Sequence, residues 1–409
     1  MTNFLLLFFV FTLFALSVQS DRGTNDDNKD MFNVVDFGAT GNGKTDDTQA
    51  FEDAWKAACN SKASSPTMQV PSGKTFLLQP LVFTGPCNAK NVYVVIDGTI
   101  IAPSNPSEWK CEDDKYCRQW IHFLDLEGLY ISGSGTINGN GDKWWGSYCE
   151  DSHERCKKKP TGFVVEHGNN VHISGLNFKD NPKMHIAFER STWVYVTDLT
   201  ITAPSDSPNT DGIHLQHSQN VFIKQSQIGT GDDCISIGDG SSNVDIRNIM
   251  CGPGHGISIG SLGEKGKEET VENVHVSEVE FRGTENGARI KTWQGGKGYA
   301  RKIVFEKITS HDSKRPIIID QYYCDHEDCH NQTSAVKVSD VRYSNIFGTS
   351  NDETAVEFAC SESVPCTDIS MNDIHLSSST EDTDDTQSIC LNVKGTQNGE
   401  VYPRVPCLT

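Results

Sequence analysis

Three segments in the middle of the chain place acidic residues and a histidine at equal intervals; they span residues 209–213, 231–235 and 254–257. Asp211, Asp233 and His255 follow one another in steps of 22 residues, and each stands two residues before an isoleucine. In a chain that coils once per ~20–30 residues, equal spacing stacks such side chains on neighbouring rungs, about 4.8 Å apart. Stacked carboxylates, with Asp232 beside them, cost stability unless a function retains them. The pattern therefore predicts an active site.

Basic and amide side chains accompany these acids. Arg289 and Lys291 flank Ile290, so both project to the same face of a strand. There they could clamp carboxylates of a ligand through charge-assisted hydrogen bonds, although a solvated pair is the alternative. Asn209 could orient Asp211 or contact hydroxyl groups of a ligand, and its alternative role is to cap a turn.

The elements that must position these residues are short β-rich runs. One series is typified by Val171-His172-Ile173 and Val221-Phe222-Ile223, and a second lies between its members, for example Ile235-Ser236-Ile237. Short strands, the absence of helical periodicity and 35 glycines predict an all-β chain folded as a right-handed parallel β-helix. An antiparallel sandwich or barrel is the rival, but the repeat is too long for hairpins. Residues 46–59 form the one amphipathic helix, which we expect to cap the N-terminal end, with Asp46 or Asp47 as its own cap.

The motifs themselves resemble a known family. NTD at 209–211, GDD at 231–233, GHG at 254–256 and RIK at 289–291 are similar in order and spacing to the signature segments of polygalacturonases, glycoside hydrolase family 28. The segment 254–263 resembles plant members in particular. The resemblance implies hydrolysis of α-1,4 bonds between galacturonic acid units of de-esterified pectin by inversion, without a metal or other cofactor. Fungal members use a tyrosine in the coil after Arg-x-Lys, and the apparent match here, 314–317, contains none.

The chemistry can also be argued from the residues. Inverting hydrolysis needs a protonated carboxyl and a water-holding carboxylate about 6.5–9.5 Å apart, which neighbouring rungs can supply. The resemblance assigns Asp232 as general acid, Asp211 and Asp233 as the pair that shares the water, and His255 as the residue that tunes Asp232. Asp232 and Asp233 reach one cleft only if they sit at a turn, which Gly231 permits. A calcium or turn site is the alternative for this acidic pair, and a structural role the alternative for His255. His185, Lys183, Tyr322 and Tyr323 are interpreted as structural.

Several rival functions remain open. A rhamnogalacturonan or xylogalacturonan hydrolase fits the same scaffold, and an inactive β-helical wall-binding protein is the alternative outside enzymes. A pectate lyase is disfavoured because elimination needs calcium-binding carboxylates and a basic arginine. We expect endo rather than exo action, which depends on whether loops close one end of the cleft.

The first 20 residues and the composition predict a secreted protein, with a retained membrane anchor as the alternative for residues 1–20. Residues 1–20 have the pattern of a secretory signal peptide, followed by a flexible stretch 21–31 and a single catalytic domain 32–409. The net charge of −20 argues against nucleic acid and anionic membranes as partners. We expect a secreted monomer of the cell wall or apoplast whose partner is pectin.

Fourteen cysteines fit an oxidising compartment, and their spacing lacks the repeated CxxC of zinc sites. A Cys234–Cys251 bridge would pin the rungs of Asp233 and His255, and Cys360–Cys366 is a second expected pair. Asn331 stands in the one sequon and could carry a glycan.

Overall fold

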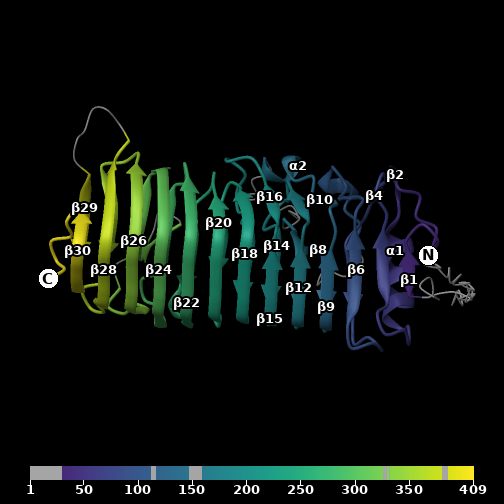
Figure 1. Cartoon of the computed structure of the whole chain (residues 1–409), viewed down its shortest axis with the longest axis horizontal. Coiled ribbons are helices and arrows are strands. Elements are labelled where there is room, and N and C mark those ends of the chain that lie inside the picture. Colours follow the sequence, from purple (N-terminus) through teal and green to yellow (C-terminus); the bar gives the residue numbers. More distant parts are fainter. Residues whose placement is uncertain (1–29, 112–116, 147–158, 326–328, 331, 380–385) are drawn as a thin grey trace, which may run out of the picture.

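The chain winds into one long parallel solenoid (Figure 1). The structure is a computed structural model that describes residues 30–111, 117–146, 159–325, 329–330, 332–379 and 386–409. The leader at 1–20, the sequon at Asn331 and the cysteines Cys149 and Cys156 lie outside these residues.

The strands fall into two parallel sheets, which we call sheet A and sheet B. The 19 strands of sheet A are β1(Met31–Asn33), β2(Asn42–Asp46), β3(Thr67–Val70), β4(Thr75–Leu77), β6(Val92–Ile96), β7(Thr99–Ile101), β9(Glu127–Ser132), β10(Thr136–Asn138), β12(Asn169–Ser174), β13(Asn177–Lys179), β15(Thr192–Thr197), β16(Thr200–Thr202), β18(Gln219–Gly229), β20(Ser242–Cys251), β22(Glu268–Arg282), β24(Lys297–Ser313), β26(Lys337–Ser350), β28(Cys366–Ser378) and β30(Val393–Tyr402). The 11 strands of sheet B are β5(Leu81–Thr84), β8(Gln119–Leu124), β11(Thr161–Glu166), β14(Ile186–Glu189), β17(Ile213–Gln216), β19(Ile235–Ile237), β21(Ile257–Leu262), β23(Asn286–Trp293), β25(Arg315–Tyr323), β27(Thr354–Ala359) and β29(Gln387–Leu391). The described helices are α1(Thr48–Cys59), η1(Pro106–Glu108), α2(Asp142–Trp145) and η2(Glu264–Gly266).

The two predicted strand series correspond to these two sheets. The Val171-type runs lie in sheet A and the Ile-Ser-Ile-type runs in sheet B, one of each per coil. Alternate residues stack inward in register, as in the column Val171, Val194, Val221, Val244 and Val274. Stacked β-branched side chains fill the interior and leave the intervening residues free to face outward. The prediction of a parallel β-helix is confirmed.

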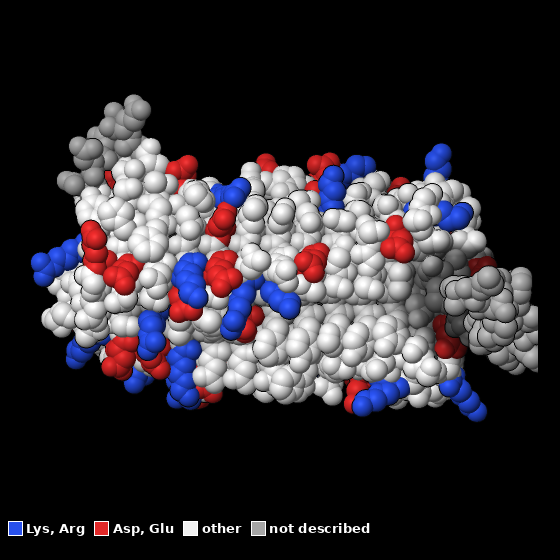
Figure 2. Space-filling view, viewed as in Figure 1, with Lys and Arg blue, Asp and Glu red and all other residues white. Residues whose placement is uncertain are grey.

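On the face shown in Figure 2, basic and acidic side chains lie interspersed rather than segregated. They are denser over the C-terminal half of this face, while the N-terminal half carries a long stretch without charge. The face therefore offers no broad basic area that could attract a polyanion.

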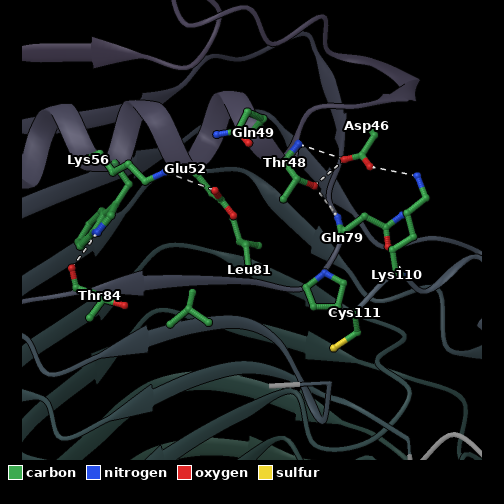
Figure 3. Close-up of a pocket in the computed structure, with 13 residues that line it drawn as sticks. Asp46, Thr48, Gln49, Glu52, Lys56, Gln79, Leu81, Thr84, Lys110 and Cys111 are labelled. Carbon is green, nitrogen blue, oxygen red and sulfur yellow. Dashed lines mark hydrogen bonds and ion pairs between the residues drawn. The ribbon is translucent and has the colours of Figure 1, made fainter. Parts of the chain in front are cut away.

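Helix α1 lies at the N-terminal end of the solenoid (Figure 1) and beside β5 (Figure 3). Its buried face includes Phe51, Ala54, Trp55 and Ala58, as the periodicity predicts. The indole N–H of Trp55 donates to the Thr84 carbonyl (3.2 Å). A hollow of about 760 Å³, crossed by the ion pair of Lys56 with Glu52, lies between this helix and β5.

Of the two residues predicted to cap this helix, Asp46 bonds to its first N–H group and Asp47 does not. Asp47 occupies the N-cap position, but its carboxylate accepts from the backbone N–H groups of Thr40 and Gly41 instead of capping the helix. Asp46 accepts from the Thr48 N–H (3.2 Å). Asp47 therefore ties the preceding loop to the helix start.

Disulfides fasten the coils at six described positions. Cys234–Cys251 and Cys360–Cys366 are paired as predicted, and the others are Cys59–Cys87, Cys111–Cys117, Cys324–Cys329 and Cys390–Cys407. This density of disulfides fits an extracellular protein. Within the described ranges, a membrane-crossing helix of sufficient length and apolarity is not found.

Candidate active site

The predicted residues meet on the outer face of sheet B, over β17 to β23. Asp211, Asp233 and His255 precede strands that begin at Ile213, Ile235 and Ile257, and these isoleucines are in register. The equal spacing thus places the side chains on successive rungs, as predicted. They line a hollow of about 490 Å³ together with Asn209, Asp232, Arg289 and Lys291.

The turn before β19 brings both adjacent aspartates into this hollow. Residues 231–233 are outside any strand, so the alternation of a regular strand does not separate Asp232 from Asp233. Gly231 is required by close approach, because a Cβ there would lie 2.1 Å from the Ser207 carbonyl oxygen. From the sequence we expected Gly231 to permit a turn. In the structure a glycine is needed there because the Ser207 backbone comes too close for a side chain.

Asp233 is buried and held by cations. Its Oδ1 accepts from Arg289 (2.6 Å) and from the Ser258 hydroxyl (2.6 Å), and its Oδ2 accepts from Lys291 (3.0 Å). Burial opposes its charge, but Arg289 and Lys291 outweigh that effect and hold the pKa of Asp233 well below its usual range. Asp233 is therefore an ionised carboxylate, and Arg289 and Lys291 together carry one more charge than it does.

Asp211 is equally enclosed but has no bonded cation among the described residues. Its Oδ2 accepts from the Ser236 hydroxyl at 2.6 Å. Burial, followed by the nearby charges of Asp232 and Asp233, raises the pKa of Asp211 to about 7. The pKa values of these two stacked carboxyls are thus shifted in opposite directions.

Asp232 is more open and receives three donors. His255 Nδ1 lies 3.1 Å from its Oδ1, which also accepts from the Asp233 N–H (2.8 Å), and Asn209 Nδ2 lies 3.5 Å from its Oδ2. Asn209 therefore contacts Asp232 and not Asp211. The hydrogen bond to Asp232 raises the pKa of His255, whose Nε2 lies 3.3 Å from Glu285.

Two further histidines support Asp211 from the N-terminal side. His185 Nδ1 lies 3.2 Å from the backbone carbonyls of Thr210 and Asp211, and burial lowers the pKa of His185 to about 4. His214 Nδ1 lies 2.8 Å from the Ser236 hydroxyl, and burial likewise lowers the pKa of His214 to about 4. Both rings are neutral near neutral pH.

Other members of the site escaped the sequence analysis. Ser236 and Ser258 are the middle residues of Ile-Ser-Ile strands, the position that faces away from the core, so this signal could have found them. Tyr323, interpreted from sequence as structural, lines the same hollow with Lys291 Nζ 5.4 Å from its ring centre. The site thus does contain a tyrosine from the coil after Arg-x-Lys, at the end of β25 rather than at 314–317.

Asp232, Asp233 and His255 each offer an atom within 4.8 Å of the others, a set that could hold a cation. However, Arg289 and Lys291 already bind both oxygens of Asp233. A metal ion would have to displace or face these two cations, so the donor set does not fit one well.

The chain also matches known proteins over most of its length. Residues 59–400 match the model of glycosyl hydrolases family 28. A polygalacturonase of Persea americana is 49% identical over 84% of this chain and 73% of its own length, and one of Malus domestica is 46% identical over 91% and 78%. The crystal structure of an exopolygalacturonase from Thermotoga maritima shares the fold, with a TM-score of 0.74, 21% identity and 90% coverage of both chains.

Proposed function

Because the chain belongs to family 28 of the glycosyl hydrolases, we propose that its site hydrolyses the α-1,4 bonds of de-esterified homogalacturonan with inversion. The observation that carries this proposal is the contrast between carboxyls in one hollow. Asp233 is fixed as an anion, whereas the pKa of Asp211, raised to about 7, lets that carboxyl take up and release a proton. Inverting hydrolysis requires such a proton-accepting carboxyl in addition to a proton-donating one.

In the proposed reaction Asp232 gives its proton to the glycosidic oxygen as the bond to the anomeric carbon breaks. A water held by Asp211 and Asp233 attacks that carbon from the opposite face and leaves its proton on Asp211. Three donors to Asp232, including His255, stabilise the carboxylate that remains after proton donation. Return of the proton from Asp211 to Asp232 then restores the starting state.

Substrate recognition rests on the same cations. Arg289 and Lys291 exceed the charge of Asp233 by one, so they can also bind a galacturonate carboxylate. Tyr323 beside Lys291 adds an aromatic face for a sugar ring. A uronate at the reacting position is therefore favoured over a neutral sugar, which separates this function from that of a rhamnogalacturonan hydrolase.

We favour endo action because the reacting strands β17 to β23 lie in the middle of sheet B, with four strands before them and three after. Exo action is the second candidate. The outward-facing residues His122, Val164 and Ala187 on the N-terminal side are almost fully buried, so the outer face of sheet B is covered there, as a cleft closed at one end requires. Viscosity loss measured against reducing ends on polygalacturonate separates them, since internal cleavage lowers viscosity long before many ends appear.

The stereochemistry tests the mechanism. Proton NMR of the first product should show the β-anomer, because water attacks opposite the leaving group. Initial α-anomer would contradict the assigned geometry, and an unsaturated product absorbing in the ultraviolet would identify a lyase. We further propose that the protein is secreted to the cell wall, as its disulfides and the leader at 1–20 favour.

A further inference from the structure

Four residues form a register row across the floor of the active site. His214, Ser236, Ser258 and Arg289 occupy equivalent positions on β17, β19, β21 and β23. Their side chains share the outward face of sheet B and lie beneath the carboxyls. The same hydrogen-bonding arrangement occurs twice in this row: a serine hydroxyl bonds to a carboxyl, and a further side chain bonds to that serine. The further side chain is Arg289 at one end and His214 at the other.

At the Arg289 end the donor and the acceptor of each hydrogen bond are unambiguous. Arg289 Nε donates to the Ser258 hydroxyl (2.7 Å), and that hydroxyl donates its single proton to Asp233 (2.6 Å). A cation behind the serine thus fixes the direction of the hydroxyl and supports the charge of Asp233. Arg289 also contacts Asp233 directly.

At the other end His214 takes the place of the arginine. Ser236 has one hydroxyl proton, and at 2.6 Å from Asp211 Oδ2 it donates there whenever Asp211 is ionised. His214 Nδ1, 2.8 Å from the same hydroxyl oxygen, must then be the donor. His214 is therefore the neutral Nδ1–H tautomer in this state, and it directs the serine proton toward Asp211 without adding a charge.

This arrangement matters because the proposed reaction needs Asp211 ionised and Asp232 protonated. Asp232 has three donors that favour its ionised form, whereas Asp211, among the described residues, has Ser236 alone. A proton on Asp211 blocks the reception of a proton from water, and burial and the neighbouring carboxylates favour that protonated form. The Ser236 bond opposes them, because it stabilises the ionised form of Asp211 and so increases the share of molecules in which the proton lies on Asp232.

We propose that His214 is a positioning residue that acts through Ser236 to favour the state in which Asp211 is ionised and Asp232 carries the proton. The inference rests on the proposed function and deepens it. Other charges also face the two groups: Asp232, Asp233 and Lys291 act on Asp211, and Lys183, Asp233 and Lys291 act on His214. The neutral Gln216 side chain is a further hydrogen-bond partner of His214.

Kinetics of three variants test the inference. Ser236→Ala removes the hydrogen bond to Asp211. The fraction of molecules with the proton on Asp232 then falls at every pH, and kcat should drop about tenfold. The same change stabilises the protonated pair, so the alkaline limb of the kcat profile should move up by about one pH unit. His214→Leu should change both quantities in the same directions. His214→Asn is the matched control, because its amide N–H can occupy the place of Nδ1–H and should keep both close to wild type.

A lower kcat with an unmoved alkaline limb would reduce Ser236 and His214 to packing residues and overturn the proposal. Equal behaviour of His214→Asn and His214→Leu would overturn the role of the donor. A second measurement does not depend on turnover: ¹⁵N NMR of histidine-labelled protein above pH 7, with His214 assigned by its loss in His214→Asn, should show a protonated Nδ1 and a bare Nε2. The opposite tautomer would refute the inference, whereas a wild-type enzyme inactive on polygalacturonate would refute the proposed function alone.

Discussion

At the scale of residues, two stacked carboxyls acquire opposite acidities from their partners. Asp211 and Asp233 precede equivalent strands, and each receives a serine hydroxyl at 2.6 Å. Only Asp233 also has Arg289 and Lys291 bound to it. Since burial penalises both anions alike, these cations decide which carboxyl keeps its charge.

Replacing the proposed acid isolates its role. Asp232→Asn should lower kcat by several orders of magnitude and leave the affinity for oligogalacturonate nearly unchanged, because proton donation acts in the transition state. Binding by calorimetry and turnover by reducing-end assay provide the comparison. More than a tenth of wild-type activity in this variant would mean that another carboxyl is the acid.

The pair of Arg289 and Lys291 should be needed for more than substrate binding. Either change to alanine leaves the buried Asp233 less well compensated, so kcat/KM on polygalacturonate should fall at least about a hundredfold. Lys56→Ala, on the exposed side of α1, is the matched control and should stay near wild type. Similar activities in the three variants would show that the two cations are dispensable.

The pH dependence follows from the raised pKa of Asp211. Asp211 should hold a proton, which in the proposed reaction it returns to Asp232, up to about pH 7 and lose it above, so activity should peak in mild acid and fail near neutrality. Toward low pH a further proton leaves no ionised base, which completes a bell-shaped profile. His255→Gln should shift the alkaline limb, because His255 is bonded to Asp232. An optimum above about pH 7.5 would contradict this account.

Most residues of the site could be predicted from the sequence, but their side-chain contacts could not. Equal spacing placed Asp211, Asp233 and His255 on successive rungs because register in a solenoid is set by coil length. The partner of Asn209, the serines behind the carboxyls and the position of Tyr323 depend on side-chain directions and loop paths. Such details arise from packing between coils 20 or more residues apart, which no local pattern contains.

At the scale of elements, the sequence predicted the two series of strands, but it did not predict how the helix begins. The two strand series separate into sheets A and B because inward β-branched residues alternate with polar ones. The start of α1 departs from expectation because Asp47 binds Thr40 and Gly41, a loop contact that capping preferences do not foresee. Local propensity located the helix, and tertiary contacts set its first turn.

The bridge between Cys234 and Cys251 gives a prediction at this scale. It joins the turn after Asp233 to the end of β20, across a sequence separation of 17 residues. Replacing both cysteines by alanine should lower the free energy of unfolding by about 3 kcal/mol. Denaturant unfolding of oxidised wild type and variant measures the loss. The Cys324–Cys329 pair is the control, since its separation of 5 residues closes a shorter loop and should stabilise less.

At the scale of the whole molecule, an acidic body must bind an acidic polymer. The net charge is −20, and the face in Figure 2 shows no basic expanse to offset it. Arg289 and Lys291, the cations proposed to bind the substrate, are instead buried on the floor of the active site. Long-range repulsion and short-range attraction therefore act on the same substrate, and they respond differently to salt.

That difference yields a test of the overall electrostatic design. Raising the ionic strength from about 0.01 M to 0.15 M shortens the Debye length from about 30 Å to about 8 Å, so it screens the repulsion between the acidic body and polygalacturonate. The ion pairs of Arg289 and Lys291 with Asp233 are shielded by burial and are screened much less. We therefore expect kcat/KM on long polygalacturonate to rise with salt at pH 6, while kcat stays nearly constant. Trigalacturonate, which carries fewer charges, is the matched substrate control and should show a smaller rise. A fall of kcat/KM with salt for the long polymer would mean that exposed cations, and not the buried pair, attract the substrate.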